Sequence, residues 1–150
     1  MGLEQKINDE IKATMLARNP EKLEALRAIK AALLLEKTKE GTTGEISETT
    51  ELKILQKLVK QRRESAEIYH NANRDDLSKK ELFEASIIET FLPRQLSTEE
   101  ITLVIKTVIE QTGASSIKDM GRVMGASSRE LAGKADNKMI SEIVKKLLGG

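Results

Sequence analysis

The chain has 150 residues, of which 39% are hydrophobic and 33% charged, so it holds one ordinary domain or two small ones and is too short for a large multidomain enzyme. Aromatic residues make up only 2% and the formal net charge is +1, which nearly excludes a base-stacking platform and argues against a chain that binds polyanions with its whole surface. Cysteine is absent, and its absence excludes disulfides, thiolate nucleophiles and thiolate metal sites.

Apolar residues recur every three or four positions along the whole chain without sustained alternation, and this pattern predicts an all-α protein. The first helix is expected over residues 2–17. Its buried side is expected to consist of Leu3, Ile7, Ile11 and Met15. Asn19 then predicts the cap, and Pro20 the first position, of a second helix that ends near residue 39. The buried side of that helix is expected to consist of Leu23, Leu26, Ile29 and Leu33.

Residues 40–45, with the sequence EGTTGE, predict a loop. A third helix is expected over residues 48–71, and its seam is formed by Leu52, Leu55, Val59, Ala66 and Tyr69. A fourth helix is expected over residues 77–91, and its buried side is formed by Leu82, Ala85, Ile88 and Phe91. Pro93 disfavours helical geometry in the residue before it, so we place a domain boundary there.

Three shorter helices are expected after the boundary. Ser97 and Glu100 have the spacing of a capping box and begin a helix that Gly113 ends. Its buried residues are expected to be Ile101, Val104, Ile105, Val108 and Ile109. Ser116 with Asp119 predicts a second cap and a helix to about residue 131, and Asp136 predicts the cap of the last helix. The buried stripe of the last helix is expected to be Met139, Ile140, Ile143, Val144 and Leu147. The expected architecture is a four-helix part over residues 1–93 followed by a three-helix domain over residues 94–150.

The longest unbroken aliphatic run is AALLL at residues 31–35, far below the roughly 20 residues that a membrane span needs. The first residues also lack the apolar core of a signal peptide. We therefore expect a cytoplasmic protein with no membrane partner.

Catalytic chemistry has little support in the sequence. His70 is the only histidine, and without a second histidine or a cysteine it completes none of the usual metal ligand sets. The tetrapeptide GASS occurs at residues 113–116 and 125–128, but Ser116 is explained as a helix cap and neither copy follows a strand, as a serine nucleophile elbow does. We expect no catalytic residue, no metal and no cofactor.

One group of basic residues lies on the third expected helix, at Lys53, Lys57, Lys60 and Arg63. The spacing of the three lysines would allow them to follow phosphates, although a solvated face opposite the seam is the simpler interpretation. Arg62 instead falls in the seam register. If it is buried it needs a carboxylate partner, for which the candidates are Glu81, Glu84 and Glu89.

A second basic group lies in the last 37 residues, around two helix starts and the turn between them. It consists of Lys118, Arg122, Arg129, Lys134 and Lys138. Helix N-termini and nearby basic side chains are natural phosphate sites. Because aromatic side chains for base stacking are scarce, a folded RNA that is read by shape is the more plausible nucleic-acid partner.

Five segments, in order and nearly end to end, resemble the YqeY-like protein family. They are LRAIKAALLLEK (26–37), QKLVKQRRESAEIY (56–69), FLPRQLSTEEI (91–101), GASSIKDMGRVMG (113–125) and GKADNKMISEIVKKLL (133–148). This family is similar to the tail domain of the B subunit of the glutamine-dependent aspartyl/glutamyl-tRNA amidotransferase. The resemblance implies an all-helical protein related to a module that contacts tRNA, with kinship to a carbon–nitrogen ligase but no catalytic site of its own.

Two functional hypotheses follow. The first is an accessory protein that binds tRNA, alone or docked to an amidotransferase or an aminoacyl-tRNA synthetase. The alternative is a helical protein–protein interaction module that uses the third-helix seam or the basic face beside it and binds no RNA. Where relatives often carry lysines, this chain has Glu130 and Ala132, which weaken the positive field around the second basic group.

Overall fold

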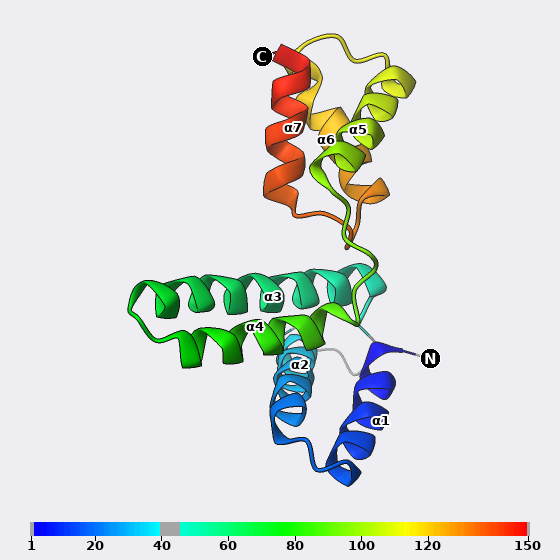
Figure 1. Ribbon diagram of the computed structural model, residues 1–150. Helices are drawn as coiled ribbons and strands as arrows, with labels where there is room; N and C mark the ends of the chain where they lie inside the picture. Colours follow the sequence, from blue (N-terminus) through cyan, green and yellow to red (C-terminus); the bar gives the residue numbers. More distant parts are fainter. Residues whose placement is uncertain (1, 40–45, 150) are drawn as a thin grey trace. The chain divides into compact units, whose positions relative to one another are not determined.

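The computed structural model describes residues 2–39 and 46–149 (Figure 1), so the expected loop at residues 40–45 lies outside the described residues. The described residues form seven α-helices and one short 3-10 helix, with no strand among them, which confirms the all-α fold class. None of the helices in these two ranges is both long and apolar enough to cross a membrane. The chain divides into two compact units, Met1–Leu92 and Pro93–Gly150.

The N-terminal unit contains α1 (Leu3–Leu16), α2 (Pro20–Lys39), α3 (Glu48–Asn71) and α4 (Asp75–Glu89). Within it α1 packs against α2, and α3 and α4 lie side by side in opposite directions and cover α2 (Figure 1). The buried core consists of Ile7, Leu26, Ile29, Leu33, Leu55, Val59, Ala85 and Ile88. All four helices contribute to one apolar cluster, so the helices of this unit are held by a shared core.

Local signals decide where these helices begin. The Asn19 side-chain oxygen accepts a hydrogen bond from the Lys22 amide at 3.2 Å, and Pro20 occupies the first helical position, as expected. Ser47 caps α3 by accepting from the Thr50 amide at 3.2 Å. Asn73 then turns the chain into α4 with a φ of +61°, a left-handed conformation that asparagine tolerates better than most residues.

Two residues predicted to lie on buried sides in the N-terminal unit are exposed. Met15 is 54% exposed, and Thr14 is buried in its place, because each four-residue step turns about 40° around a helix. Two such steps put Met15 about 80° from the buried Ile7, whereas a seven-residue step returns Thr14 to within about 20°. Leu82 is 49% exposed, because two three-residue steps separate it by about 120° from the buried Ile88.

The C-terminal unit contains α5 (Thr98–Thr112), the 3-10 helix η1 (Ile117–Asp119), α6 (Met120–Glu130) and α7 (Asn137–Gly149). Its buried core consists of Ile101, Ile105, Val108, Val123, Leu131, Ala135, Ile140, Val144 and Leu148. The predicted capping box of α5 is confirmed, since Ser97 and Glu100 bond each other's backbone amides. Gly113 ends α5 with a φ of +69°. The prediction that Met139 is buried is wrong, because the stripe of α7 follows Ile140, Val144 and Leu148 instead.

Candidate nucleic-acid interface

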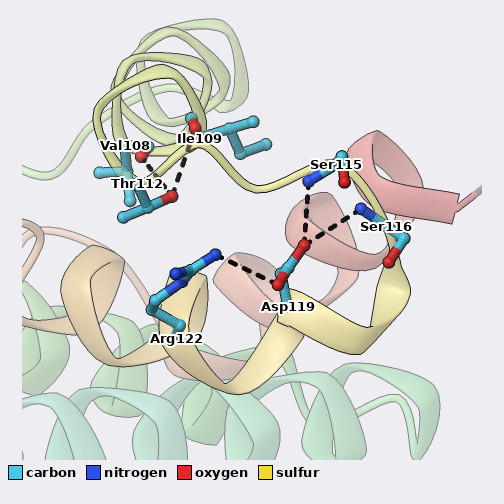
Figure 2. A network of polar contacts seen from close by, with 7 residues as sticks. All are labelled: Val108, Ile109, Thr112, Ser115, Ser116, Asp119 and Arg122. Atoms are coloured by element: carbon cyan, nitrogen blue, oxygen red, sulfur yellow. Dashed lines mark hydrogen bonds and ion pairs between the residues drawn. The ribbon is translucent and has the colours of Figure 1, made fainter.

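The junction between α5 and α6 is built around one carboxylate, that of Asp119 (Figure 2). Its Oδ2 accepts hydrogen bonds from the amides of Ser115 and Ser116 at 3.0 and 3.3 Å, which confirms the predicted cap. These backbone bonds are the main reason why the pKa of Asp119 lies below its usual value. The amides of Ser115 and Ser116, which precede η1, are therefore already bonded to a carboxylate of the chain itself.

Arg122 is engaged by the same carboxylate. Its Nη2 atom donates to Asp119 Oδ1 at 3.1 Å and so forms an ion pair in the first turn of α6 (Figure 2). Both charges are partly exposed, so the pair adds little stability but reduces the positive field that Arg122 presents. Of the second basic group, Arg122 is thus the least available for a phosphate.

The structure does not bring the five residues of the second basic group together. A Cβ on Gly149 would lie 3.3 Å from the Ile117 Cβ, so η1, which contains Lys118, lies at the C-terminal end of α7. Lys138 lies in the first turn of the same helix. Thirteen helical residues rise about 20 Å, so Lys118 and Lys138 mark opposite ends of α7.

The remaining residues flank the turn between α6 and α7. Arg129 lies in the last turn of α6, Lys134 in the connection and Lys138 in the first turn of α7. We call these three residues the turn set. All three are exposed, and none is ion-paired to another residue within the described ranges. Arg129 also lines a small groove between α5 and α6.

The turn itself is held by two hydrogen bonds from the segment that precedes α5. The Gln95 side-chain amide donates to the Gly133 carbonyl at 2.6 Å, and the Leu96 amide donates to the Lys134 carbonyl at 3.0 Å. Gly133 permits this path because its φ is +75°. These bonds place the start of α5 beside the turn that leads into α7, so two helix N-termini lie near Lys134 and Lys138.

Arg94 lies at this end too and was missed at the sequence level. Its guanidinium donates to both carboxylate oxygens of Glu100, at 3.1 and 2.7 Å, and Glu100 also accepts from the Ser97 amide at 3.1 Å. The pKa of Glu100 is lowered to about 2, and the hydrogen bond from Arg94 contributes most to this shift and the Ser97 backbone bond the next most. A basic residue three positions before a capping box is the sequence signal that would have found this pair. Since Arg94 is already paired, we do not add it to the turn set.

The Glu100 carboxyl is expected to titrate with a pKa of about 2, well below the ordinary value of 4.5. Because the folded pKa is the lower one, ionised Glu100 stabilises the C-terminal unit above pH 4.5, and this contribution is lost as the pH falls towards 2. An NMR titration of the side-chain carboxyl measures the midpoint. Arg94→Gln should raise the midpoint without restoring the ordinary value, since the Ser97 amide still donates. A midpoint near 4.5 in the unmodified protein would contradict the expected pairing.

On α3 the basic residues differ in their partners. Lys53, Lys57 and Lys60 are exposed and have no ion pair with any described residue. Arg63 is ion-paired with Glu89. The four residues therefore do not act as one set, and only the three lysines remain available.

Arg62 lies at the packed side of α3, where its side chain is 19% exposed. Its Nε lies 3.6 Å from Glu84 Oε2, and this nitrogen has no hydrogen-bond partner among the described residues. Glu84, one of the three carboxylates considered, is 7% exposed, and burial raises its pKa despite the opposing effect of Arg62. The pair borders a groove between α2, α3 and α4.

His70 has the carboxylate of Asp75 as a neighbour. It is exposed at the end of α3, and its Nδ1 lies 2.8 Å from Asp75 Oδ1. Within residues 2–39 and 46–149, no three histidine, aspartate or glutamate side chains are grouped so as to hold a metal ion.

Comparison with known proteins gives two findings. The sequence matches the Yqey-like protein family over residues 4–148. A curated relative, "Altered inheritance of mitochondria protein 41, mitochondrial" from Pyrenophora tritici-repentis (strain Pt-1C-BFP), is 25% identical over 149 residues. The aligned region covers 96% of this chain and 80% of that relative.

Proposed function

The chain belongs to the Yqey-like protein family, and from this premise we propose that it is an accessory RNA-binding protein that contacts folded tRNA through its phosphates. The family is related to the tail domain of the tRNA-dependent amidotransferase B subunit, which supports tRNA as the RNA class. The chain has only three aromatic residues, all of them in the N-terminal unit. Contacts to the RNA backbone, without base stacking, therefore suit the C-terminal unit best.

The observation that carries this proposal is the turn set. Arg129, Lys134 and Lys138 are exposed and lack ion-pair partners among the described residues. Lys134 and Lys138 lie at the end where α5 and α7 begin, and Arg129 lies in the last turn of α6, beside the last turn of α5. Helix N-termini and basic side chains both favour anions. Glu130 and the capping Asp136 reduce the local field, so we expect few phosphate contacts and a modest affinity.

Fluorescence anisotropy with labelled total tRNA at 50 and 200 mM salt tests the proposal. The three phosphate contacts of the turn set predict an affinity that falls with salt and contribute about −2 to −3 to the log–log slope. Replacing the turn set together, as Arg129→Glu, Lys134→Glu and Lys138→Glu, should weaken binding about tenfold or more and flatten the slope.

The matched control makes the same change in charge at the other end of the C-terminal unit, as Lys118→Glu, Lys145→Glu and Lys146→Glu. These three lysines are exposed, and the control should bind tRNA within about threefold of the unmodified protein. Equal losses in the two variants would contradict a localised interface. No binding below about 10 µM at low salt would contradict the proposed function as a whole.

The alternative of a protein-interaction module has less support. Its first candidate surface, the seam of α3, is occupied inside the N-terminal unit, where Leu55, Val59 and Ala66 are buried. Docking to an amidotransferase or an aminoacyl-tRNA synthetase remains part of the proposal, and capture of either enzyme by the tagged full chain in nuclease-treated extract would support it. The cytoplasmic location also stays a prediction, since the similar fungal protein carries a mitochondrial name.

A further inference from the structure

We infer that the N-terminal unit contributes a second RNA-contacting surface, formed by Lys53, Lys57 and Lys60 on the outer face of α3. This inference rests on the proposed function and deepens it, because it assigns phosphate contacts of the same RNA to both units. We call these three residues the lysine row.

The lysine row lies on the side of α3 that faces away from the core. The three positions fall within about 60° of one another around the helix and rise about 10 Å along it. Leu55 and Val59, which alternate with the row in sequence, point to the opposite side and are buried. The packing that buries them therefore fixes the direction in which the row faces, and the side chains themselves are exposed.

The charges of the row are not neutralised within the described part of the unit. Some basic residues of the unit are paired, as Lys22 is with Glu10 and Lys80 with Glu24, and others such as Lys12 and Lys79 are exposed without an ion-pair partner in the described ranges but do not form a row of like charges on their helices. The row has no such partner among the described residues, and the next acidic side chains on this face are those of Glu64 and Glu67, beyond its C-terminal end. Three like charges held close together without acids among them form a local positive surface on a chain that is nearly neutral overall.

The surroundings of the row favour a polyanion over a protein partner. Thr49 and Gln61 flank the row on α3, so its immediate neighbours on this face are polar and provide no apolar anchor. Protein interfaces obtain most of their binding energy from buried aromatic or apolar anchors and are depleted in lysine. Phosphate contacts need no anchor of that kind, and flexible lysine side chains make them as point charges.

Two weak surfaces on one chain bind more tightly than either alone when they engage the same RNA. The second contact is then intramolecular, and its contribution depends on an effective concentration set by the connection between the units. Either surface should therefore be necessary for full affinity, and loss of both should reduce binding more than loss of one.

The test compares labelled total tRNA binding to full-length variants at several salt concentrations. Lys53→Glu, Lys57→Glu and Lys60→Glu in one protein should weaken binding about tenfold at 50 mM salt and reduce the salt slope by about 2 to 3. Glutamate is as good a helix former as lysine, so α3 should stay folded, which circular dichroism checks. The matched control, Lys12→Glu, Lys39→Glu and Lys79→Glu, changes the charge equally at exposed lysines on three other helices and should bind within about threefold of the unmodified protein.

The outcomes separate this inference from the proposed function. If the lysine-row variant binds like the unmodified protein while the turn-set variant does not, the inference is overturned and the proposed function stands. If the lysine-row variant and its control lose affinity equally, only net charge matters and the inference is overturned as well. If the unmodified protein binds no tRNA, the proposed function fails and the inference fails with it.

Discussion

Arg62→Leu is expected to lower the free energy of unfolding of the N-terminal unit by about 3 kcal/mol, because it leaves the buried Glu84 carboxylate without its ion-pair partner. Leucine fills part of the volume of the arginine stem, so lost packing accounts for a smaller share of the effect. The substitution therefore isolates the electrostatic part of the pair better than alanine would.

The pH dependence of this loss has a definite sign. Burial first, and Glu81 next, raise the pKa of Glu84, while Arg62 opposes both. A carboxyl with a raised folded pKa favours folding in its protonated form, and that advantage disappears as the pH rises through the folded pKa. Removing Arg62 raises the pKa further, so the deficit of the leucine variant should be largest near neutral pH and shrink on acidification.

Chemical denaturation of a double-mutant cycle measures the pairing. Arg62→Leu and Glu84→Leu should each destabilise the unit, and the double variant should be more stable than Arg62→Leu because no uncompensated charge stays buried. Lys80, which is paired with Glu24, also lowers the pKa of Glu84, but less than Arg62 does, so it only moderates the effect. An unchanged denaturation midpoint for Arg62→Leu would refute the structural role of Arg62.

Ile105→Ala should cost the C-terminal unit about 3 kcal/mol and unfold it before the N-terminal unit. Ile105 is fully buried in the cluster that α5, α6 and α7 share, so its truncation leaves a cavity at the centre of that core. A unit of this size has only a small free energy of unfolding, and a loss of this magnitude removes much of it.

Tyr69 is a natural fluorescence probe for this experiment. This residue, the single tyrosine of the chain, lies in α3, so tyrosine fluorescence reports on the N-terminal unit, whereas circular dichroism follows the helices of both units. Ile105→Ala should lower the first helical transition and leave the Tyr69 transition in place. Lys106→Ala, at the exposed neighbouring position, is the control and should change neither. A single transition in which both signals shift together would show that the units do not unfold separately.

Much of the fold could be predicted because its signals are local. The bounds of α3 and the caps formed by Asn19, Ser97 and Asp119 depend on residues three or four positions apart, and the structure confirms them. The family match likewise depends on residue patterns along the chain. The buried faces were predicted less well, since Met15, Leu82 and Met139 are apolar residues that their helices leave exposed.

The candidate site depends on contacts that a local pattern does not contain. The sequence places Lys118 and Lys138 twenty residues apart without indicating whether the fold brings them together. The bond from Gln95 to Gly133 spans 38 positions, and the approach of Ile117 to Gly149 spans a similar stretch. These contacts separate Lys118 from Lys134 and Lys138, which lie beside the starts of α5 and α7.

The sequence by itself therefore determined the all-helical class, the starts of α2, α3, α5 and α7, and the family, because hydrogen-bonded caps and helical periodicity act within a few residues. The tertiary structure alone decided which apolar residues are buried, which carboxylate pairs with Arg62, and which basic residues share a surface. Those outcomes depend on how helices that are distant in the chain cross and pack, and such packing involves residues of several segments at once.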